Sequence, residues 1–429
     1  MRRLLVIATA VAAVLSASVL VSLAPGAPAA ACPAATAKAL IGGKRVCLRA
    51  GQKCVLRFNG QYRRYGFVCK TGRLTRRSRW VSTDLGTLGG RQSWAMGINE
   101  RGQIVGRADT RVVGGVGAEH AFLWQSGKMI DLDTLGDPYI YSVAVAINES
   151  GQVVVNTRQT YPSTRWRAFL WDQGVLTEID GLGGKDIQGT AINERGQIIG
   201  SIDFKRAFVW QNGVTTDLGG LGGTRTGAAA INDSGQIVGG SETAAGPTHA
   251  FLWQNGKMSD LGTLGGAGST ARAINARGWV VGSSEATTGK QHAFLFGDYE
   301  MVDLGTLGRA LSQATAINDQ GQIIGSVTTA SGDSTHGFLS SGGGSFLRRT
   351  TDLGEIEPTA INERGQVIGT RRPGFNRALL WEDGVLRDLA TLGGLSIAAA
   401  INERDQIVGS SDTRGGATHA VLWTLRRGT

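Results

Sequence analysis

The sequence predicts an all-β fold, an eight-bladed β-propeller of four-stranded blades that an N-terminal strand closes, preceded by a small disulfide-rich module. Three observations support this prediction. A three-part motif returns about every 43 residues, as in Ala230–Gly239, His249–Trp253 and Asp84–Gly90. Short apolar segments alternate with turns that contain Asn and Gly. All four cysteines precede the repeats.

Residues 1–31 have the composition of a secretory signal peptide. Arg2 and Arg3 form a basic start, an apolar run extends from Leu4 to Leu23, and small residues continue to Ala31. We therefore expect export and a secreted or cell-surface location. An uncleaved anchor and a lipid anchor on Cys32 remain alternatives, and either would attach the protein to a membrane. The Gly-broken repeats nowhere approach the roughly 18 continuous apolar residues that a membrane span needs.

Residues 32–79 contain Cys32, Cys47, Cys54 and Cys69 and form the predicted disulfide-stabilised module. An even number of clustered cysteines in an exported protein indicates disulfides, and three pairings are open. So short a segment buries little core, and each disulfide contributes about 2–5 kcal/mol. A four-cysteine zinc site is the alternative, but the segment lacks the close Cys-x-x-Cys pairs typical of zinc.

The module is strongly basic, with 13 Lys and Arg and no Asp or Glu from Cys32 to Arg79, whereas the repeats are net acidic. Such a surface suits anionic polymers, either phosphate-bearing wall polymers or acidic lipid head groups. Nucleic acid is not an expected partner outside the cell. Alternatively, the aromatic residues form a miniature core and the arginines only solvate it. The candidate binding residues combine both types: Tyr62, Arg63, Arg64, Tyr65, Arg76 and Arg77.

Residues 80–429 form the predicted propeller, in which each repeat supplies four short strands and nothing indicates a helix. An Ala-x-Ala-Ile strand leads through Asn-x-x-Gly into Gln-Ile-Val-Gly, and His-Ala-Phe-Leu-Trp then leads through a tight turn into Asp-Leu-Gly. We expect Asn and Gly in these turns because both accept a positive φ. The Ile-Asn turn occurs eight times, at Asn99, Asn148, Asn193, Asn232, Asn275, Asn318, Asn362 and Asn402.

The two ends of the repeat region complement each other. The last repeat stops after its third strand, Val421–Trp423, whereas Arg79–Leu85 is a fourth strand ahead of the first repeat. Joining them closes a ring and removes the open sheet edges. Small residues such as Ala398–Ala400 suit the crowded innermost strands. A linear β-solenoid is the alternative, but it has no need of a strand from the other terminus.

These motifs resemble the HAF-type extracellular repeat family, after the triplets at His120–Phe122, His249–Phe251 and His292–Phe294. The resemblance covers about Trp80–Trp423. It implies a secreted, propeller-like repeat protein without a well-defined activity. Repeat two departs from the pattern at Val155 and Asn156, and repeat six at Gly337 and Ser340, so we expect less regular blades there.

All five histidines begin the third strand of a repeat, where the other three repeats have Arg167, Arg206 and Arg377. Arginine does not ligate metals, but both residue types donate N–H groups. The position therefore indicates a structural hydrogen bond, either to the Asp of Asp-Leu-Gly or to a loop carbonyl. We expect neither metal nor cofactor, and no histidine is left for a nucleophilic triad.

Acidic residues fall into two groups. One group follows the turn Asn and is explained by turn chemistry: Glu100, Glu149, Glu194, Asp233, Asp319, Glu363 and Glu403, with Ala276 in repeat five. The other group lies in connections that share one face of a propeller: Asp137, Asp186, Asp203, Glu242, Glu285, Glu355, Glu357 and Asp412. These loops vary most in length, so we expect ligands on this face.

The leading functional hypothesis is a monomeric binding scaffold, which we favour over an enzyme, with a polysaccharide or protein on its loop face. The basic module then tethers it to an anionic surface. A glycosidase or lyase that uses loop-face carboxylates is the alternative. A purely structural matrix component is a third hypothesis.

Overall fold

The computed structural model describes residues 37–64, 67–76, 79–111, 118–132, 140–159, 164–329, 335–341, 349–371 and 376–426. The chain divides into two compact units, with the boundary between Ser78 and Arg79. Each unit is described by itself. In the described part of the chain, no helix is long and apolar enough to cross a membrane.

The N-terminal unit contains two β-hairpins and two short helices: β1 (Ala37–Ile41), β2 (Lys44–Leu48), the 3-10 helix η1 (Leu56–Phe58), α1 (Asn59–Arg64), β3 (Phe67–Lys70) and β4 (Arg73–Arg76). Leu48, Phe67 and Leu74 form its small buried core. A disulfide joins Cys54 to Cys69, with the two Cα atoms 5.7 Å apart. Cys47 is also disulfide-bonded. The remaining cysteine, Cys32, and the predicted signal peptide lie outside the described residues.

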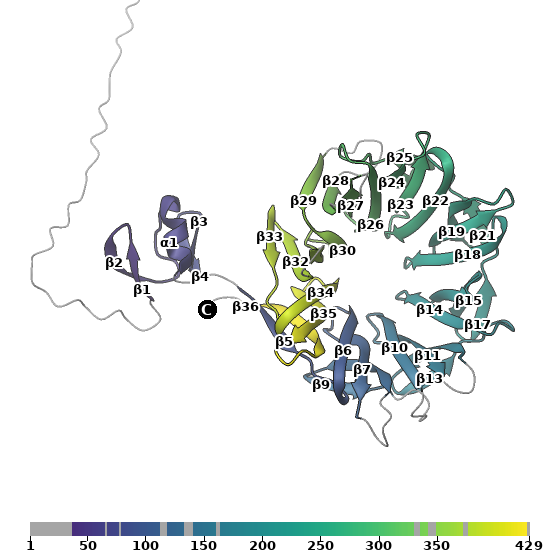
Figure 1. Cartoon of the computed structure of the whole chain (residues 1–429), viewed down its shortest axis with the longest axis horizontal. Coiled ribbons are helices and arrows are strands. Elements are labelled where there is room, and N and C mark those ends of the chain that lie inside the picture. Colours follow the sequence, from purple (N-terminus) through teal and green to yellow (C-terminus); the bar gives the residue numbers. More distant parts are fainter. Residues whose placement is uncertain are drawn as a thin grey trace, which may run out of the picture. The chain divides into compact units, whose positions relative to one another are not determined.

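The second unit is a ring of eight four-stranded antiparallel sheets, which confirms the predicted propeller (Figure 1). Blades 1 to 4 comprise β6 (Gly89–Ile98), β7 (Ile104–Thr110), β8 (Glu119–Gln125), β9 (Lys128–Asp131); β10 (Ile140–Ile147), β11 (Val153–Gln159), β12 (Trp166–Asp172), β13 (Val175–Glu178); β14 (Ile187–Ile192), β15 (Ile198–Ile202), β16 (Arg206–Gln211), β17 (Val214–Asp217); and β18 (Gly222–Ile231), β19 (Ile237–Thr243), β20 (Thr248–Gln254), β21 (Lys257–Asp260). Blades 5 to 8 comprise β22 (Gly265–Ile274), β23 (Val280–Ala286), β24 (Gln291–Gly297), β25 (Glu300–Asp303); β26 (Leu311–Ile317), β27 (Gln322–Thr328), β28 (Thr335–Ser341), β29 (Arg349–Gly354); β30 (Glu357–Ile361), β31 (Val367–Arg371), β32 (Arg377–Glu382), β33 (Val385–Asp388); and β34 (Gly393–Ile401), β35 (Gln406–Thr413), β36 (Thr418–Arg426) with β5 (Arg79–Asp84).

Blade 8 closes the ring as predicted. Its outermost strand is β5, which pairs antiparallel with β36 so that Trp80 lies opposite Leu425 and Asp84 opposite Val421. Figure 1 shows this N-terminal strand beside the C-terminal one. The ring therefore has no blade with an unpaired third strand, and the solenoid alternative is wrong.

A β-bulge in the innermost strand explains the glycine of Gln-Ile-Val-Gly. The register of every first strand shifts two residues before its Ile, as between Ala95 and Gly97 in blade 1. The bulge brings a carbonyl against the second strand, so a Cβ on Gly106 would lie 1.9 Å from the Trp94 oxygen. Blade 2 has Val155 at this position and keeps the same bulge. Both departing repeats, two and six, form complete four-stranded sheets.

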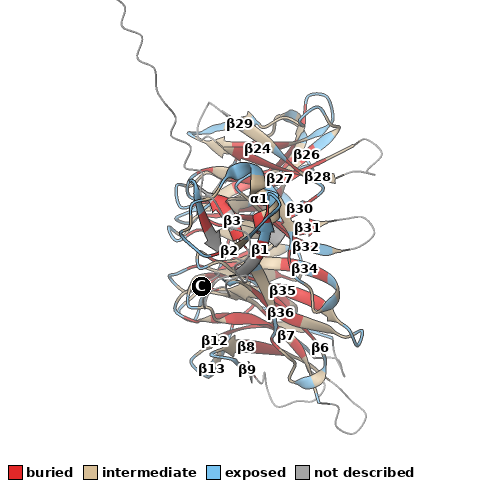
Figure 2. Ribbon diagram, turned by 90° about the vertical axis from the view of Figure 1, so that its left-hand side faces the viewer, coloured by how far each residue is buried: buried red, intermediate tan, exposed pale blue. Residues whose placement is uncertain are grey.

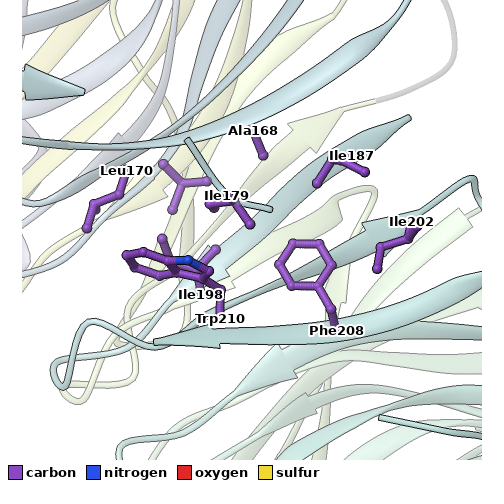
Figure 3. Packing of buried hydrophobic residues seen from close by; sticks show 9 residues of the cluster. Ala168, Leu170, Ile179, Ile187, Ile198, Ile202, Phe208 and Trp210 are labelled. Atoms are coloured by element: carbon purple, nitrogen blue, oxygen red, sulfur yellow. The ribbon is translucent and has the colours of Figure 1, made fainter. Parts of the chain in front are cut away.

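The core lies between blades rather than at one centre. Between blades 2 and 3, Ala168 and Leu170 pack against Ile187, Phe208 and Trp210 (Figure 3). Figure 2 shows buried residues along the strands and exposed ones mainly at their ends. The propeller therefore has two faces at the ends of its strands. The turn face contains the Asn-x-x-Gly turns and the turns between third and fourth strands, and the loop face contains all other connections. Burial of each large apolar side chain contributes about 1.5–3 kcal/mol.

Candidate functional site

The eight turn asparagines form a closed ring of hydrogen bonds on the turn face. Each Nδ2 donates to the backbone oxygen of the Asn in the next blade, at 3.0 to 3.2 Å, and Asn402 completes the circle by donating to Asn99. Each Oδ1 accepts backbone N–H groups of its own turn, such as those of Arg101 and Gln103. None of these asparagines has a positive φ. The expected conformational reason for Asn is therefore wrong in the Asn-x-x-Gly turns, where the reason is hydrogen bonding between blades. It is confirmed in the tight turns, where Asn212 and Asn255 have φ of 50° and 51°.

The acids that follow these asparagines also join blades. Each carboxylate accepts the backbone N–H of the corresponding residue in the preceding blade, at 2.6 to 3.1 Å, as in Glu403 N–H to Glu100. Ala276 interrupts this carboxylate ring, so Asp233 N–H has no such acceptor. Burial raises the pKa of Glu194, and the nearby Asp233 and Glu149 carboxylates raise it further, whereas the donated N–H of Glu149 lowers it.

The histidines form the predicted structural hydrogen bond to the Asp of Asp-Leu-Gly. Nδ1 of His249 lies 2.8 Å from the Asp260 carboxylate, and the same pairing occurs at every other His. Arg167 and Arg206 replace His with the same geometry toward Glu178 and Asp217. In blade 7, Asp388 instead pairs with Arg371. Within the described residues, no group of three or more His, Cys, Asp or Glu could hold a metal.

Five of the eight loop-face acids that the sequence singled out accept hydrogen bonds, four of them within their own blade. Asp203 accepts the N–H groups of Asp186 and Lys185, which lower its pKa. Thr224 donates its hydroxyl and N–H to Glu242 and lowers the pKa of that carboxyl. Glu285 and Asp412 are further acceptors within their own blades, whereas Asp186 accepts the Trp166 N–H of blade 2. Asp137 lies outside the described residues. These carboxylates hold the starts of first and third strands, which is a structural role.

Blades 1 and 2 contain the largest departure from the repeat. On the loop side, three aromatic rings alternate with two guanidinium groups: Arg107 lies over Trp94 and Tyr141, at 4.1 and 5.8 Å, and Arg158 lies over Tyr141 and Trp166, at 5.8 and 5.4 Å. Tyr141 and Trp166 also meet edge to face, with ring centroids 5.8 Å apart. Each such cation–π contact contributes about 0.5–1 kcal/mol at an exposed site. We call these five residues the arginine–aromatic ladder.

The ladder has unused hydrogen-bonding capacity. Arg107 pairs with Glu119, but its buried Nε has no hydrogen-bond partner. Arg158 is exposed, and no acidic partner is seen for it in the described part of the chain. An unpaired buried donor is costly, by about 1–3 kcal/mol, and calls for an explanation. Sequence reasoning missed this set, although the signal was present: Arg107 stands where six of the other repeats have Gly, Ser or Thr.

The ladder adjoins a cavity of about 630 Å³ in the central channel, which the innermost strands line. Trp94 is part of the ladder and also lines the cavity. Met96, Val145 and Ile397 line the cavity from blades 1, 2 and 8, whereas Thr315 and Glu357 line it from blades 6 and 7. The channel is thus apolar on one side and polar on the other, which suits a ligand with both characters.

The candidate residues of the basic module are only partly described. Tyr62 is buried in the core of the module, at 6% exposure, which removes it from the binding set and fits the miniature-core alternative. Arg63 and Arg64 lie in α1 and Arg76 in β4. Tyr65 and Arg77 lie outside the described residues. Binding by these arginines stays a prediction.

No family model matches the chain, and no curated protein matches it. Among solved structures, it is similar to a puromycin-hydrolysing peptidase of Mycobacterium tuberculosis, with 12% identity, TM-score 0.45, and 63% of this chain and 49% of that chain covered. The propeller domain of the Trilobed protease from Pyrococcus furiosus has 11% identity and TM-score 0.42, with 73% and 98% covered. TolB from Acinetobacter baumannii has 13% identity and TM-score 0.37, with 76% and 80% covered. The chain spans about half the length of the peptidase. Similarity at this level is no guide to what the chain binds.

Proposed function

We propose that this chain is an exported binding scaffold of the HAF type that holds an anionic polysaccharide on the loop face of blades 1 and 2. The arginine–aromatic ladder is the observation that carries this proposal. Aromatic rings stack on the apolar faces of sugars, and guanidinium groups form paired hydrogen bonds with carboxylate, sulfate or phosphate groups. Arg107 pairs with Glu119, whereas no acidic partner is seen for Arg158 in the described residues, so the ladder favours an anionic ligand.

The disulfide Cys54–Cys69 is compatible with an oxidising compartment and so supports export. The basic module then supplies a second, electrostatic contact with anionic surface polymers. A glycosidase needs two carboxylates at one site, and a lyase needs a base. Among the described residues that line the cavity, Glu357 is the single acid, so the geometry favours binding over hydrolysis.

The test is calorimetric titration of polygalacturonate, an anionic polysaccharide, into the full chain, with dextran as the neutral comparison. Arg158→Gln should weaken binding about tenfold because one charge-assisted hydrogen-bonding group is lost. Arg225→Gln removes an exposed arginine from blade 4 on the same face and should leave the affinity unchanged. If Arg158→Gln lowers only the melting temperature, the ladder is a structural brace and the proposal fails.

The tether is tested separately in the full chain by replacing Arg63, Arg64, Arg76 and Arg77 with Gln. Retention on an immobilised polyphosphate-type wall polymer should fall, and its dependence on salt concentration should flatten, because fewer charges are screened. Retention that is equal in both proteins, or insensitive to salt in the wild type, would exclude the electrostatic tether.

A further inference from the structure

Blade 5 departs from the repeat at several positions that meet at one end, on the turn face. Trp279 replaces a Gln that all seven other blades keep. Gly297 lies opposite it, where five other blades have Gln, Asp or Glu and blades 6 and 8 have Ser341 and Thr424. Tyr299 replaces the glycine of the turn between the third and fourth strands. Ala276 is the gap in the carboxylate ring. We call Arg277, Trp279 and Tyr299 the blade 5 turn patch.

Tyr299 has a backbone conformation that is unfavourable for a residue with a side chain. Its φ is 65°, whereas the corresponding turns of five other blades have Gly127, Gly174, Gly213, Gly256 and Gly384 at φ 76° to 91°. The left-handed conformation is strained for a residue with a side chain. Packing gives no compensation, because Tyr299 is 98% exposed. A strained, fully exposed aromatic residue in an otherwise uniform repeat indicates a functional constraint.

Trp279 and Arg277 extend this aromatic surface. In other blades the Gln hydrogen-bonds across to the third strand, as Gln236 does to Gln254. In blade 5 the indole covers Gly297 instead, since a Cβ there would lie 2.9 Å from Cδ1 of Trp279. The Arg277 guanidinium lies 5.2 Å from the centroid of this ring. Trp279 also packs on the core between blades 5 and 6, which fixes its position.

The charges around the patch exclude an anionic partner. Asp298 and Glu300 flank Tyr299, and Asp319 accepts the Ala276 N–H at 2.7 Å. Three carboxylates and one guanidinium therefore belong to these neighbouring turns, and their summed charge is negative. Two aromatic side chains, at about 150–250 Å² each, cover less than the roughly 800 Å² per partner of a stable protein interface, so the patch by itself favours a small ligand.

We propose that the blade 5 turn patch is a second binding site, for a neutral saccharide, on the face opposite the arginine–aromatic ladder. Tyr299 stacks on the apolar C–H face of a sugar ring, and Arg277, Asp298 and Glu300 hydrogen-bond its hydroxyl groups. One ring then carries two sites of different chemistry on its two faces, which lets it connect a neutral chain to an anionic one.

The test uses saturation-transfer NMR and calorimetry on the full chain with three neutral probes: cellohexaose, chitohexaose and maltohexaose. At least one should bind the wild type. Tyr299→Gly should lower its affinity about tenfold, which is the scale of one aromatic contact, and should raise the melting temperature because Gly relieves the strained turn. The double variant Trp279→Gln/Gly297→Gln restores the repeat pair and should lower the affinity similarly.

A matched control should keep wild-type affinity: Val214→Ala, an exposed apolar residue beside the equivalent turn of blade 3. Three outcomes overturn the proposal. None of the probes binds the wild type, binding survives in Tyr299→Gly, or sedimentation shows that the wild type self-associates and that Tyr299→Gly abolishes the association.

Discussion

Blades 4 and 8 have the same interactions although they are assembled differently. The four strands of blade 4 are consecutive in the sequence. The fourth strand of blade 8 is β5, in which Asp84 lies 335 residues before its partner His419. The His-to-Asp distance is 2.8 Å in blade 4 and 2.9 Å in blade 8, and the Asn Nδ2 bond to the next blade is 3.0 Å in both. The motif therefore fixes the geometry of a blade regardless of how the chain connects its strands.

The difference between these blades is entropic. Closing a longer loop costs more conformational entropy, although only about 0.6 kcal/mol for each doubling of length. In blade 8 the same contacts must therefore offset a larger entropy cost of loop closure. We expect it to open more readily than blade 4, and the following predictions test that expectation.

The largest effect should come from removing the closing strand. Replacing Arg79–Asp84 with a Gly-Ser linker of equal length leaves β36 as an open edge, and each lost backbone hydrogen bond costs about 0.5–1.5 kcal/mol. We expect a clear loss of melting temperature, aggregation, and fast amide exchange in β36 measured by mass spectrometry. Val81→Thr, which keeps the backbone pairing, is the control. Unchanged exchange in β36 would contradict ring closure.

An intermediate effect should come from the asparagine ring. Asn402→Ala breaks the closing junction and Asn232→Ala breaks an internal one, and each leaves buried backbone groups without partners, at about 1–3 kcal/mol per group. We expect similar losses of unfolding free energy in urea, but faster local exchange only in Asn402→Ala. Equal exchange in both variants would show that chain connectivity is irrelevant to local opening.

The smallest effect concerns Glu194 in the carboxylate ring. Its pKa is raised in the folded state, mainly by burial, so its ionised form destabilises the fold above that pKa. Glu194→Gln keeps an acceptor for the Glu149 N–H and should melt slightly higher than the wild type at pH 7. The difference should disappear at about pH 3, below the ordinary Glu pKa, where the carboxyl is protonated in both states. A difference that is constant between these pH values would show that the pKa shift has no effect on stability.

The two rings on the turn face show where sequence reasoning reached its limit. Asn99 and Glu100 were correctly placed in a tight turn, but their hydrogen-bond partners are 49 residues away in the next blade. The periodic pattern shows that such residues recur, not that they face one another. The pairing of His249 with Asp260 was predictable because both residues lie in one blade, 11 positions apart.

The sequence alone determined the number of blades, their four strands and the closing strand, because each blade is a local unit whose apolar segments and turns follow one another along the chain. Only the tertiary structure decided which departures from the repeat meet. Trp94 and Arg158 lie in different blades, and Trp279 and Tyr299 lie in different turns, before β23 and β25, so their proximity depends on strand register and on the packing of neighbouring sheets. The repeats allowed the fold to be predicted from the sequence. The residues that depart from the repeat became candidate sites only when three-dimensional packing brought them together.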